Sequence, residues 1–360
     1  MDYIRRVTLR CLCRDLSEDW GDTSQFRDFR VLWDVLRSDC KDSGVADLIE
    51  SLPTVGMADH PLVRSFSASF EAGGHTVRRE SISGLTSPHW WKQKVSRWRG
   101  AATDSDLIGE GEVWLCAGGL RAAGDDRDFY RSFMSRVAAG GAEQFLPDED
   151  DRRLQRVETK IARREAWARQ IQLSVLVCLE RAYQVGIPVP FHVPAPSPCK
   201  VESPLLHLEF DFARETVEGE ELNELYLRVS SQDLSRLNLV EEAVHLVQEA
   251  VEPIVDEWRL LPGQGNDLHW SVIVSQSVIN ASAEAVELGE LPESIAESGL
   301  RLAVRAHYAK KHSIVDATID GEPVRGLCGM WFVPTMNPDH LDVCSVCADA
   351  YRDMDSGNEI

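Results

Sequence analysis

The apolar positions of the chain follow two periods, and the dominant period changes along the sequence. In residues 1–60 they recur every three or four positions, the spacing of an amphipathic helix, until Pro53 ends the pattern. This region is therefore predicted to be a helical entry region. The apolar residues are Phe29, Leu32, Trp33, Val35 and Leu36 in a first run and Val45, Leu48, Ile49 and Leu52 in a second.

Residues 61–146 contain short extended segments and predict a small α+β domain. We interpret Trp90–Ala102 as one strand or sheet edge, and Gly111–Ala117 as a buried strand. Asp125 or Asp126 is placed to cap a helix that follows. The apolar face of that helix is formed by Phe129, Phe133 and Val137.

The longest helix is predicted over residues 147–187. Acidic residues open it, apolar residues keep a spacing of three or four, and Gly186 and Pro188 end it. At 1.5 Å per residue, a helix of roughly 34 residues is about 50 Å long. The next stretch, 188–204, has six prolines in 17 residues and predicts a linker.

Residues 205–300 predict a second α+β domain, because apolar and polar residues alternate strictly from Leu206 to Phe212. The polar positions His207, Glu209 and Asp211 share one strand face, which is either a wet sheet surface or a cation site. Further patterns predict a strand around Leu225–Val229, a helix at Ser235–Trp258, a strand at Leu268–Ser275 and a helix at Pro292–Tyr308. With a separate C-terminal module over 301–360, the fold class is multi-domain α+β: small sheets, amphipathic helices and one long central helix.

Composition and charge limit the function classes. The chain has 360 residues, 43% apolar residues and a formal net charge of −21, which opposes a general affinity for nucleic acid. Residues 64–101 differ, with seven basic residues and two acidic ones. The nine cysteines are mostly scattered, which favours reduced thiols in a cytoplasmic protein. No membrane-spanning run and no glycine-rich nucleotide motif occurs, so we expect no membrane partner and no nucleotide cofactor.

Cysteine and histidine residues near the C-terminus have the spacing of a metal site. Cys344 and Cys347 form a CxxC, and Cys328 lies 16 positions upstream in a Leu-Cys-Gly corner. His307 lies 21 positions before Cys328 and is the first candidate for the fourth ligand, with His312 and His340 as alternatives. A Cys3His set divided between short turns is typical of structural zinc (Zn²⁺) sites. The C-terminal module over 301–360 is therefore predicted to be a zinc ribbon. Asp320-Gly321 predicts a hairpin turn in this module.

The same segment resembles a small actinobacterial zinc-ribbon-like family of unknown function. The likeness covers residues 307–354 and rests on His307-Tyr308, on the run from Gly321 to Gly329, and on Val343-Cys344-Ser345-Val346-Cys347. It implies His307 as the fourth zinc ligand, since the family has a His-Tyr pair there. It implies no activity.

A basic and aromatic segment suggests a second site. Indole rings stack on unpaired bases while cations hold phosphates, so single-stranded RNA or DNA is one partner that fits. A protein interface and an ordinary core with solvated charges are the other two interpretations. The candidate residues are Trp91, Lys92, Lys94, Arg97, Trp98, Arg99 and Arg121.

Residues 76–136 also resemble the RelE-type bacterial toxins, which cut ribosome-bound mRNA with basic residues on a small sheet. The resemblance rests on a strand that ends in Arg97-Trp-Arg99-Gly-Ala-Ala, a turn, and then Val113–Ala117 and Arg121. The resemblance implies phosphate binding by Arg97, Arg99 and Arg121, and His89 or His75 as the nearest proton acceptor. Those toxins are small and basic, whereas this chain is long and acidic. The sequence therefore predicts a zinc-stabilised, cytoplasmic bacterial binding or accessory protein in a nucleic-acid-linked system. A metal-independent endoribonuclease and a protein-interaction scaffold are the alternatives.

Overall fold

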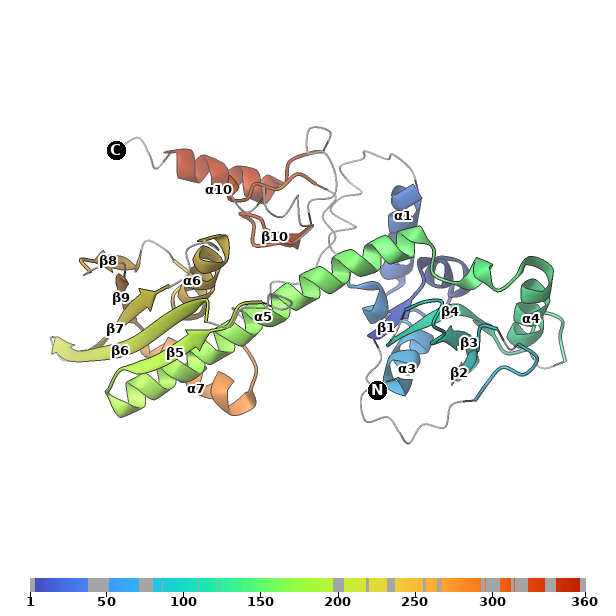
Figure 1. Cartoon of the computed structure of the whole chain (residues 1–360), viewed down its shortest axis with the longest axis horizontal. Coiled ribbons are helices and arrows are strands. Elements are labelled where there is room, and N and C mark those ends of the chain that lie inside the picture. Colours follow the sequence, from blue (N-terminus) through green and yellow to red (C-terminus); the bar gives the residue numbers. More distant parts are fainter. Residues whose placement is uncertain are drawn as a thin grey trace. The chain divides into compact units, whose positions relative to one another are not determined.

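A computed structural model of the chain divides into two compact units (Figure 1). Unit 1 comprises residues 1–159, 300–308 and 325–360, and unit 2 comprises residues 160–299 and 309–324. The structure describes residues 4–37, 52–70, 80–85, 87–109, 111–122, 124–196, 204–217, 220–231, 237–254, 257–263, 267–292, 295, 305–311, 314, 323–333 and 341–356. The predicted helix around Val45–Leu52 falls almost wholly outside these ranges. None of the described helices is both long and apolar enough to cross a membrane.

The N-terminal part of unit 1 is built on a four-stranded sheet of order β1-β4-β3-β2. Strand β1 pairs parallel with β4, and the other pairs are antiparallel. Strand β4 contains the predicted Gly111–Ala117 strand, apart from its first residue, and extends three residues beyond it. The strands are β1 Ile4–Val7, β2 Trp91–Val95, β3 Trp98–Thr103 and β4 Glu112–Leu120.

The prediction of one strand over Trp90–Ala102 is wrong. The segment is a hairpin of β2 and β3, in which Val95 lies opposite Trp98 and Lys94 lies opposite Arg99. Ser96 takes up a φ of +47°, which reverses the chain without a glycine. The turn has no Gly, Asn or Pro, so no residue typical of turns marks its position in the sequence.

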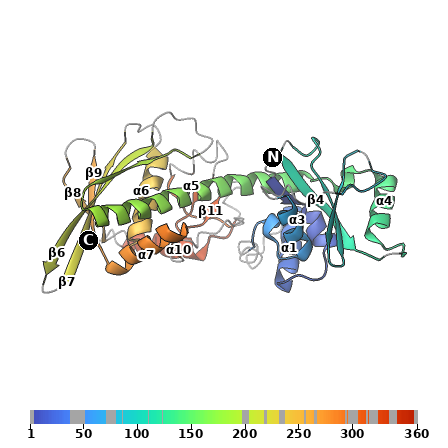
Figure 2. The ribbon, with the colours of Figure 1, turned by 90° about the horizontal axis from the view of Figure 1, so that it is seen from below.

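Helices cover both faces of this sheet, with α1 and α3 on one side and α4 on the other (Figure 1, Figure 2). Two adjacent glycines permit the close approach: a Cβ on Gly118 would meet Leu16 and Leu62, and a Cβ on Gly119 would meet Phe129. The helices are α1 Thr23–Arg37, α3 Pro61–Ser69 and α4 Phe129–Gly140, with a π-helical turn η1 at Cys11–Asp15 and 3₁₀ turns at Val55–Met57 and Glu143–Phe145.

The N-cap of α4 is Asp128, and the prediction of Asp125 or Asp126 is wrong. The Asp128 carboxylate accepts a hydrogen bond from the Tyr130 amide (3.2 Å). Asp125 instead accepts from the Arg127 amide (2.9 Å), which closes a turn before the helix. Asp125, Asp126 and Asp128 are all residues that can cap a helix, so the sequence alone does not identify the N-cap. The backbone conformation of the folded chain determines which of them takes that position.

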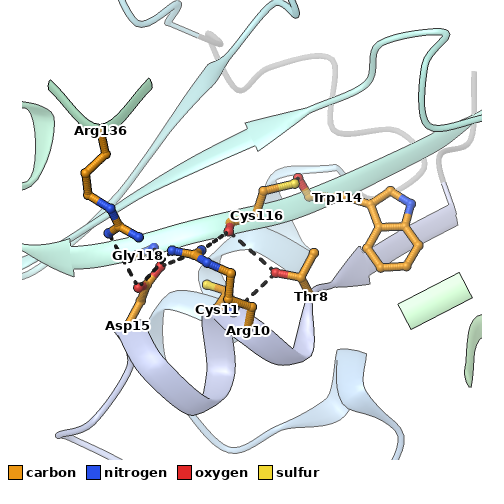
Figure 3. Close-up of polar contacts among 8 residues, drawn as sticks. All are labelled: Thr8, Arg10, Cys11, Asp15, Trp114, Cys116, Gly118 and Arg136. Atoms are coloured by element: carbon orange, nitrogen blue, oxygen red, sulfur yellow. Dashed lines mark hydrogen bonds and ion pairs between the residues drawn. The ribbon is translucent and has the colours of Figure 1, made fainter. Parts of the chain in front are cut away.

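A buried polar network ties η1 to β4 (Figure 3). Asp15 accepts a hydrogen bond from the Gly118 amide (3.1 Å) and pairs with Arg10 (3.3 Å), while Arg136 lies 3.9 Å away. Burial raises the pKa of Asp15, and Arg10 and the Gly118 amide oppose that rise. Arg10 also donates to the Cys116 carbonyl (3.2 Å). Because the largely buried Asp15 and Arg10 satisfy each other and the backbone of β4, we interpret the network as structural.

The long helix α5 extends from Glu149 to Val185, as the sequence predicts. Leu154 belongs to the apolar core of unit 1, and residues from Trp167 to Ala182 belong to the core of unit 2. Three acids in its first turn complement the helix dipole. Asp151 accepts hydrogen bonds from the Leu9 amide (2.8 Å) and the Asp148 amide (3.2 Å), which ties the start of α5 to the N-terminal strand.

Unit 2 is a two-layer structure in which helices cover one face of a five-stranded antiparallel sheet (Figure 1). The strands predicted at Leu206 and Leu225 form its centre. The order is β5-β6-β7-β9-β8. The strands are β5 Val189–Val193, β6 Leu206–Val217, β7 Glu220–Ser230, β8 Arg259–Leu261 and β9 Leu268–Val274.

Part of the predicted proline-rich linker is an edge strand. Residues Val189–Val193 pair antiparallel with β6 as strand β5, and Val189 and Val193 are buried. Pro190 is tolerated because an edge strand leaves one row of backbone groups unpaired. Proline content alone therefore does not distinguish a linker from an edge.

The helices of unit 2 agree only in part with the prediction. Helix α6 spans Leu237–Val251 and ends before Pro253, not at Trp258. Helix α7 spans Gln276–Leu288 and was not predicted, although Ser275 caps it and Gly289 ends it with a φ of +68°. Of the helix expected at Pro292–Tyr308, residues 305–308 are not helical, and 293–294 and 296–304 lie outside the described ranges.

Glu158 on α5 should make the stability of unit 1 depend on pH. Its carboxylate accepts from the Val55 amide (3.1 Å) and pairs with Arg6 (3.3 Å), but burial raises the pKa of Glu158 to about 7. An unfolded Glu titrates near pH 4.3, so between about pH 4.3 and 7 the folded state holds a proton that unfolding releases. The free energy of unfolding should fall as pH rises through this window, by on the order of 3 kcal/mol.

Urea unfolding between pH 4.5 and 7.5 measures this slope. Glu158→Gln should make the slope smaller, though not zero, because burial also raises the pKa of Asp151 to about 6. Glu149→Gln, a change at an exposed position of the same helix, should leave the slope as in the wild type. Equal slopes in the wild type and Glu158→Gln would refute the assignment.

Candidate metal centre

Three backbone segments meet in the C-terminal module. The extended segment around Ala306 forms a parallel bridge with Val343, and the Leu327 amide donates to the Tyr308 carbonyl (2.7 Å). The other two segments are the hairpin of β10 (Val324–Arg325) and β11 (Trp331–Phe332), and the helix α10 (Ser345–Ser356). Figure 2 labels β11 and α10. These contacts bring His307, the hairpin turn and the start of α10 together.

Four donor side chains gather where these segments meet: His307, Cys328, Cys344 and Cys347. Their ligand atoms all lie within 4.8 Å of one another. His307 Nδ1 lies 3.4 Å from Cys328 Sγ and 3.6 Å from Cys347 Sγ. In a tetrahedral zinc site with bonds of about 2.0 and 2.3 Å, the nitrogen–sulfur edge is about 3.5 Å. The four side chains therefore lie close enough to bind one metal ion.

Local backbone structure explains the position of each cysteine. Cys328 lies in the turn between β10 and β11, where Gly329 takes a φ of +84° and its amide donates to the Gly326 carbonyl (2.9 Å). Cys344 directly precedes α10, and Cys347 lies in its first turn. A helix N-terminus carries a partial positive charge that favours thiolates.

Burial sets the electrostatics of the cluster. Cys344, Cys347 and His307 are less than 9% exposed. Burial raises the pKa of the Cys328 thiol to about 12, and a hydrogen bond from the Met330 backbone opposes that rise. Ring packing also fixes the imidazole, since the ring centroids of His307 and Phe332 are 5.1 Å apart.

The hairpin in this module is not the one expected from Asp320-Gly321. Residues 315–322 lie outside the described ranges, and the observed hairpin turns at Leu327–Gly329. His312 and His340, the alternative fourth ligands, also lie outside them. Within the part of the chain that the structure describes, His307 is the histidine found with the three cysteines.

The structure separates the candidate nucleic-acid residues into two groups. Lys94 on β2 lies opposite Arg99 on β3, and Lys92 lies two residues before Lys94 on the same strand. Arg99 also lies opposite Gly119 on β4, and Arg121 follows Gly119 by two residues. Alternation therefore places all four cations on one face of the sheet, the face that α4 covers in part. We call Lys92, Lys94, Arg99 and Arg121 the basic face.

The other three candidate nucleic-acid residues, Arg97, Trp98 and Trp91, do not lie on the basic face. Arg97 forms ion pairs with Asp19 (2.7 Å) and Glu18 (2.8 Å), and Trp98 is 2% exposed with its indole N–H donating to Asp19 (2.8 Å). Trp91 donates to Asp104 (2.8 Å) and packs with the α1–α3 side of the core.

Of the two predicted proton acceptors, the structure describes only His89, which does not lie on the basic face. The His89 ring lies against Trp91, with centroids 4.3 Å apart, and its Nε2 lies 3.0 Å from Ser81 Oγ. His75 is outside the described ranges.

Acidic residues neutralise part of the basic face. Glu80 lies 2.6 Å from Lys94 and 3.7 Å from Lys92, and Asp128 lies 2.5 Å from Arg121. Arg99 donates to the backbone carbonyls of Ser96 and Trp98, and no ion pair involving it is found among the described residues.

Sequence reasoning missed one residue beside the basic face. The Tyr130 ring lies 5.7 Å from Lys92 Nζ and 5.9 Å from Arg121 Cζ. Burial raises the pKa of Tyr130 to about 12. The Asp128 cap is the signal that places Tyr130 in the first turn of α4.

Comparison with known proteins returns one family. Residues 303–354 match the family DUF3039, described as a protein of unknown function. The C-terminal likeness to an uncharacterised family is thereby confirmed at that level. No curated protein and no solved structure matches the chain, so the likeness to RelE-type toxins stays a prediction.

Replacement of the histidines should identify the fourth ligand. His307→Ala should lower the zinc affinity of purified protein by about tenfold or more, because a four-ligand site loses one bond. His312→Ala and His340→Ala should keep the wild-type affinity, measured by competition with a chromophoric chelator. A loss confined to either of those two variants would overturn the assignment.

Proposed function

We propose that the four C-terminal side chains hold one zinc ion as a structural staple. The supporting observation is the convergence of their donor atoms within 4.8 Å. Four protein ligands fill the tetrahedral shell of zinc and leave no position for substrate or water, as in structural sites. Two-residue strands and one 12-residue helix form too small a core to be stable alone, so metal binding supplies the folding energy.

The chain works by binding, and its basic face takes a single-stranded nucleic acid. The basic face has four cations, and two acids, Glu80 and Asp128, pair with them. The face therefore carries a local positive charge, although the chain has a net charge of −21. Side-chain exposures of 43% for Lys94 and 41% for Arg121 leave both cations accessible. Phosphates attract such a face, and each contact releases counterions. A protein partner is the alternative occupant.

Binding is favoured over cleavage. Attack by a ribose 2′-hydroxyl on the adjacent phosphate needs a group that removes the proton. Among the residues that the structure describes, the His89 ring lies against Trp91, which is not on the basic face, and burial raises the pKa of Tyr130 to about 12. We therefore assign the basic face to phosphate binding. A RelE-like endoribonuclease is the outcome that the experiment must exclude.

The zinc content of the purified protein tests the proposed structural zinc site. Freshly purified, reduced protein should contain about one zinc per chain. Cys344→Ser with Cys347→Ser should lose it and expose the C-terminal segment to protease, because the staple is removed. Ser345→Ala, between the two ligands and exposed, is the control and should retain the metal. Metal analysis without zinc in the wild type would end the proposal.

Two arginines two residues apart give a matched test of the basic face. Arg99→Ala should weaken binding of a uridine oligonucleotide and lower the log–log salt slope by about 0.7, the value for one phosphate contact to a single strand. Arg97→Ala makes the same charge change on a residue already held by Asp19 and Glu18, and should leave the slope unchanged.

The same assay separates the alternatives. Equal effects of both variants would refute the assignment of binding to the basic face. No retention of RNA at low salt would refute nucleic-acid binding and favour a protein partner. Cleavage of an end-labelled oligonucleotide by the wild type would refute binding alone and support the endoribonuclease.

A further inference from the structure

The uncovered face of the second sheet carries two histidines on neighbouring strands. His192 of β5 lies directly opposite His207 of β6. Their neighbours Val193 and Leu206 are buried, so alternation turns both imidazoles away from the helices. The two Nδ1 atoms are 2.9 Å apart, and the ring centroids are 4.7 Å apart.

Two ring nitrogens at this distance share either a proton or a metal ion. A hydrogen bond between them uses the lone pair of one ring and the N–H of the other. When Nδ1 carries no proton in either ring, two lone pairs converge on one position. With metal–nitrogen bonds of about 2.0–2.1 Å, two ligands at a right angle are about 2.9 Å apart, and two tetrahedral ligands about 3.4 Å.

The observed 2.9 Å separation is that of an ordinary hydrogen bond and also that of two ligands at a right angle. Right angles between neighbouring ligands are the geometry of tetragonal Cu(II) and Ni(II), and imidazole is a ligand that both accept. We propose that His192 and His207 form a two-histidine site for a tetragonal divalent ion, which clips the edge strand β5 to β6.

This two-histidine site differs from the cation site of His207, Glu209 and Asp211 that the sequence suggested. Glu209 and Asp211 lie on the same face as His207, but Glu209 lies 3.8 Å from Arg228. The cluster at the C-terminus is the one place among the described residues where three or more metal-ligand side chains converge. Water therefore fills the remaining positions around an ion held by the two histidines.

Nickel binding to the full chain, with its C-terminal cysteines loaded with zinc, tests the proposal. Equilibrium dialysis should find one Ni(II) site, whose affinity falls by about tenfold or more in His192→Ala and in His207→Ala, since each removes one of two metal bonds. His269→Ala is the matched control. It lies on the same sheet face, opposite Arg228 and not opposite a second histidine, and should bind as the wild type does.

Two further measurements keep the result independent of the zinc proposal. The Cys344→Ser, Cys347→Ser variant should retain the nickel site. Nickel should raise the melting temperature of unit 2 in the wild type but not in His207→Ala, because a ligand bound only to the folded state stabilises it. The proposal is overturned if the zinc-loaded wild type takes up no nickel, or if His269→Ala loses as much affinity as His192→Ala.

Discussion

The apolar stripe of helix α5 is the constraint on which both cores depend. Amphipathic helices are stabilised mainly by burying one face, and α5 buries different parts of its length in two cores. Leu154 packs in the core of unit 1, while Trp167, Ile171 and Leu179 pack in that of unit 2. A break within α5 would therefore remove apolar surface from one core or the other. The buried acids Asp151 and Glu158 lie in the first third of the helix, where backbone amides of the N-terminal region donate hydrogen bonds to them.

Elements with a strong period were predicted well from the sequence. The α5 stripe and the alternation from Leu206 to Phe212 each repeat often enough to outweigh local exceptions. The wrong predictions of secondary structure arise where a single residue determines the local backbone conformation. Ser96 turns the chain at a positive φ without a glycine, and Pro190 sits in an edge strand that needs only one row of hydrogen bonds. Helix α7 is rich in alanine and serine, so its apolar stripe is weak and only its caps mark it.

The two candidate sites differed in how much the sequence disclosed. Metal ligands are recognised by residue type and spacing, so the four C-terminal side chains could be named before their geometry was known. The basic face depends on strand register, which the sequence did not contain. Arg97 and Arg99 look equivalent in the sequence, yet the turn at Ser96 directs one to Asp19 and leaves the other on the face with Lys94. A one-residue change in the register of β3 would turn Arg99 to the opposite face of the sheet, away from Lys94.

Net acidity and a basic face are compatible because charges act over short distances in salt. At physiological ionic strength the Debye length is about 8 Å, so acids elsewhere on the chain are largely screened from the sheet. Among the described residues, Glu80 and Asp128 are the acids that pair with cations of the basic face, and neither pairs with Arg99. The screened acids still act in dilute salt, where they repel polyanions that approach from other directions. Binding would then be confined to the part of the surface where Arg99 lies, and strands without access to that face would be excluded.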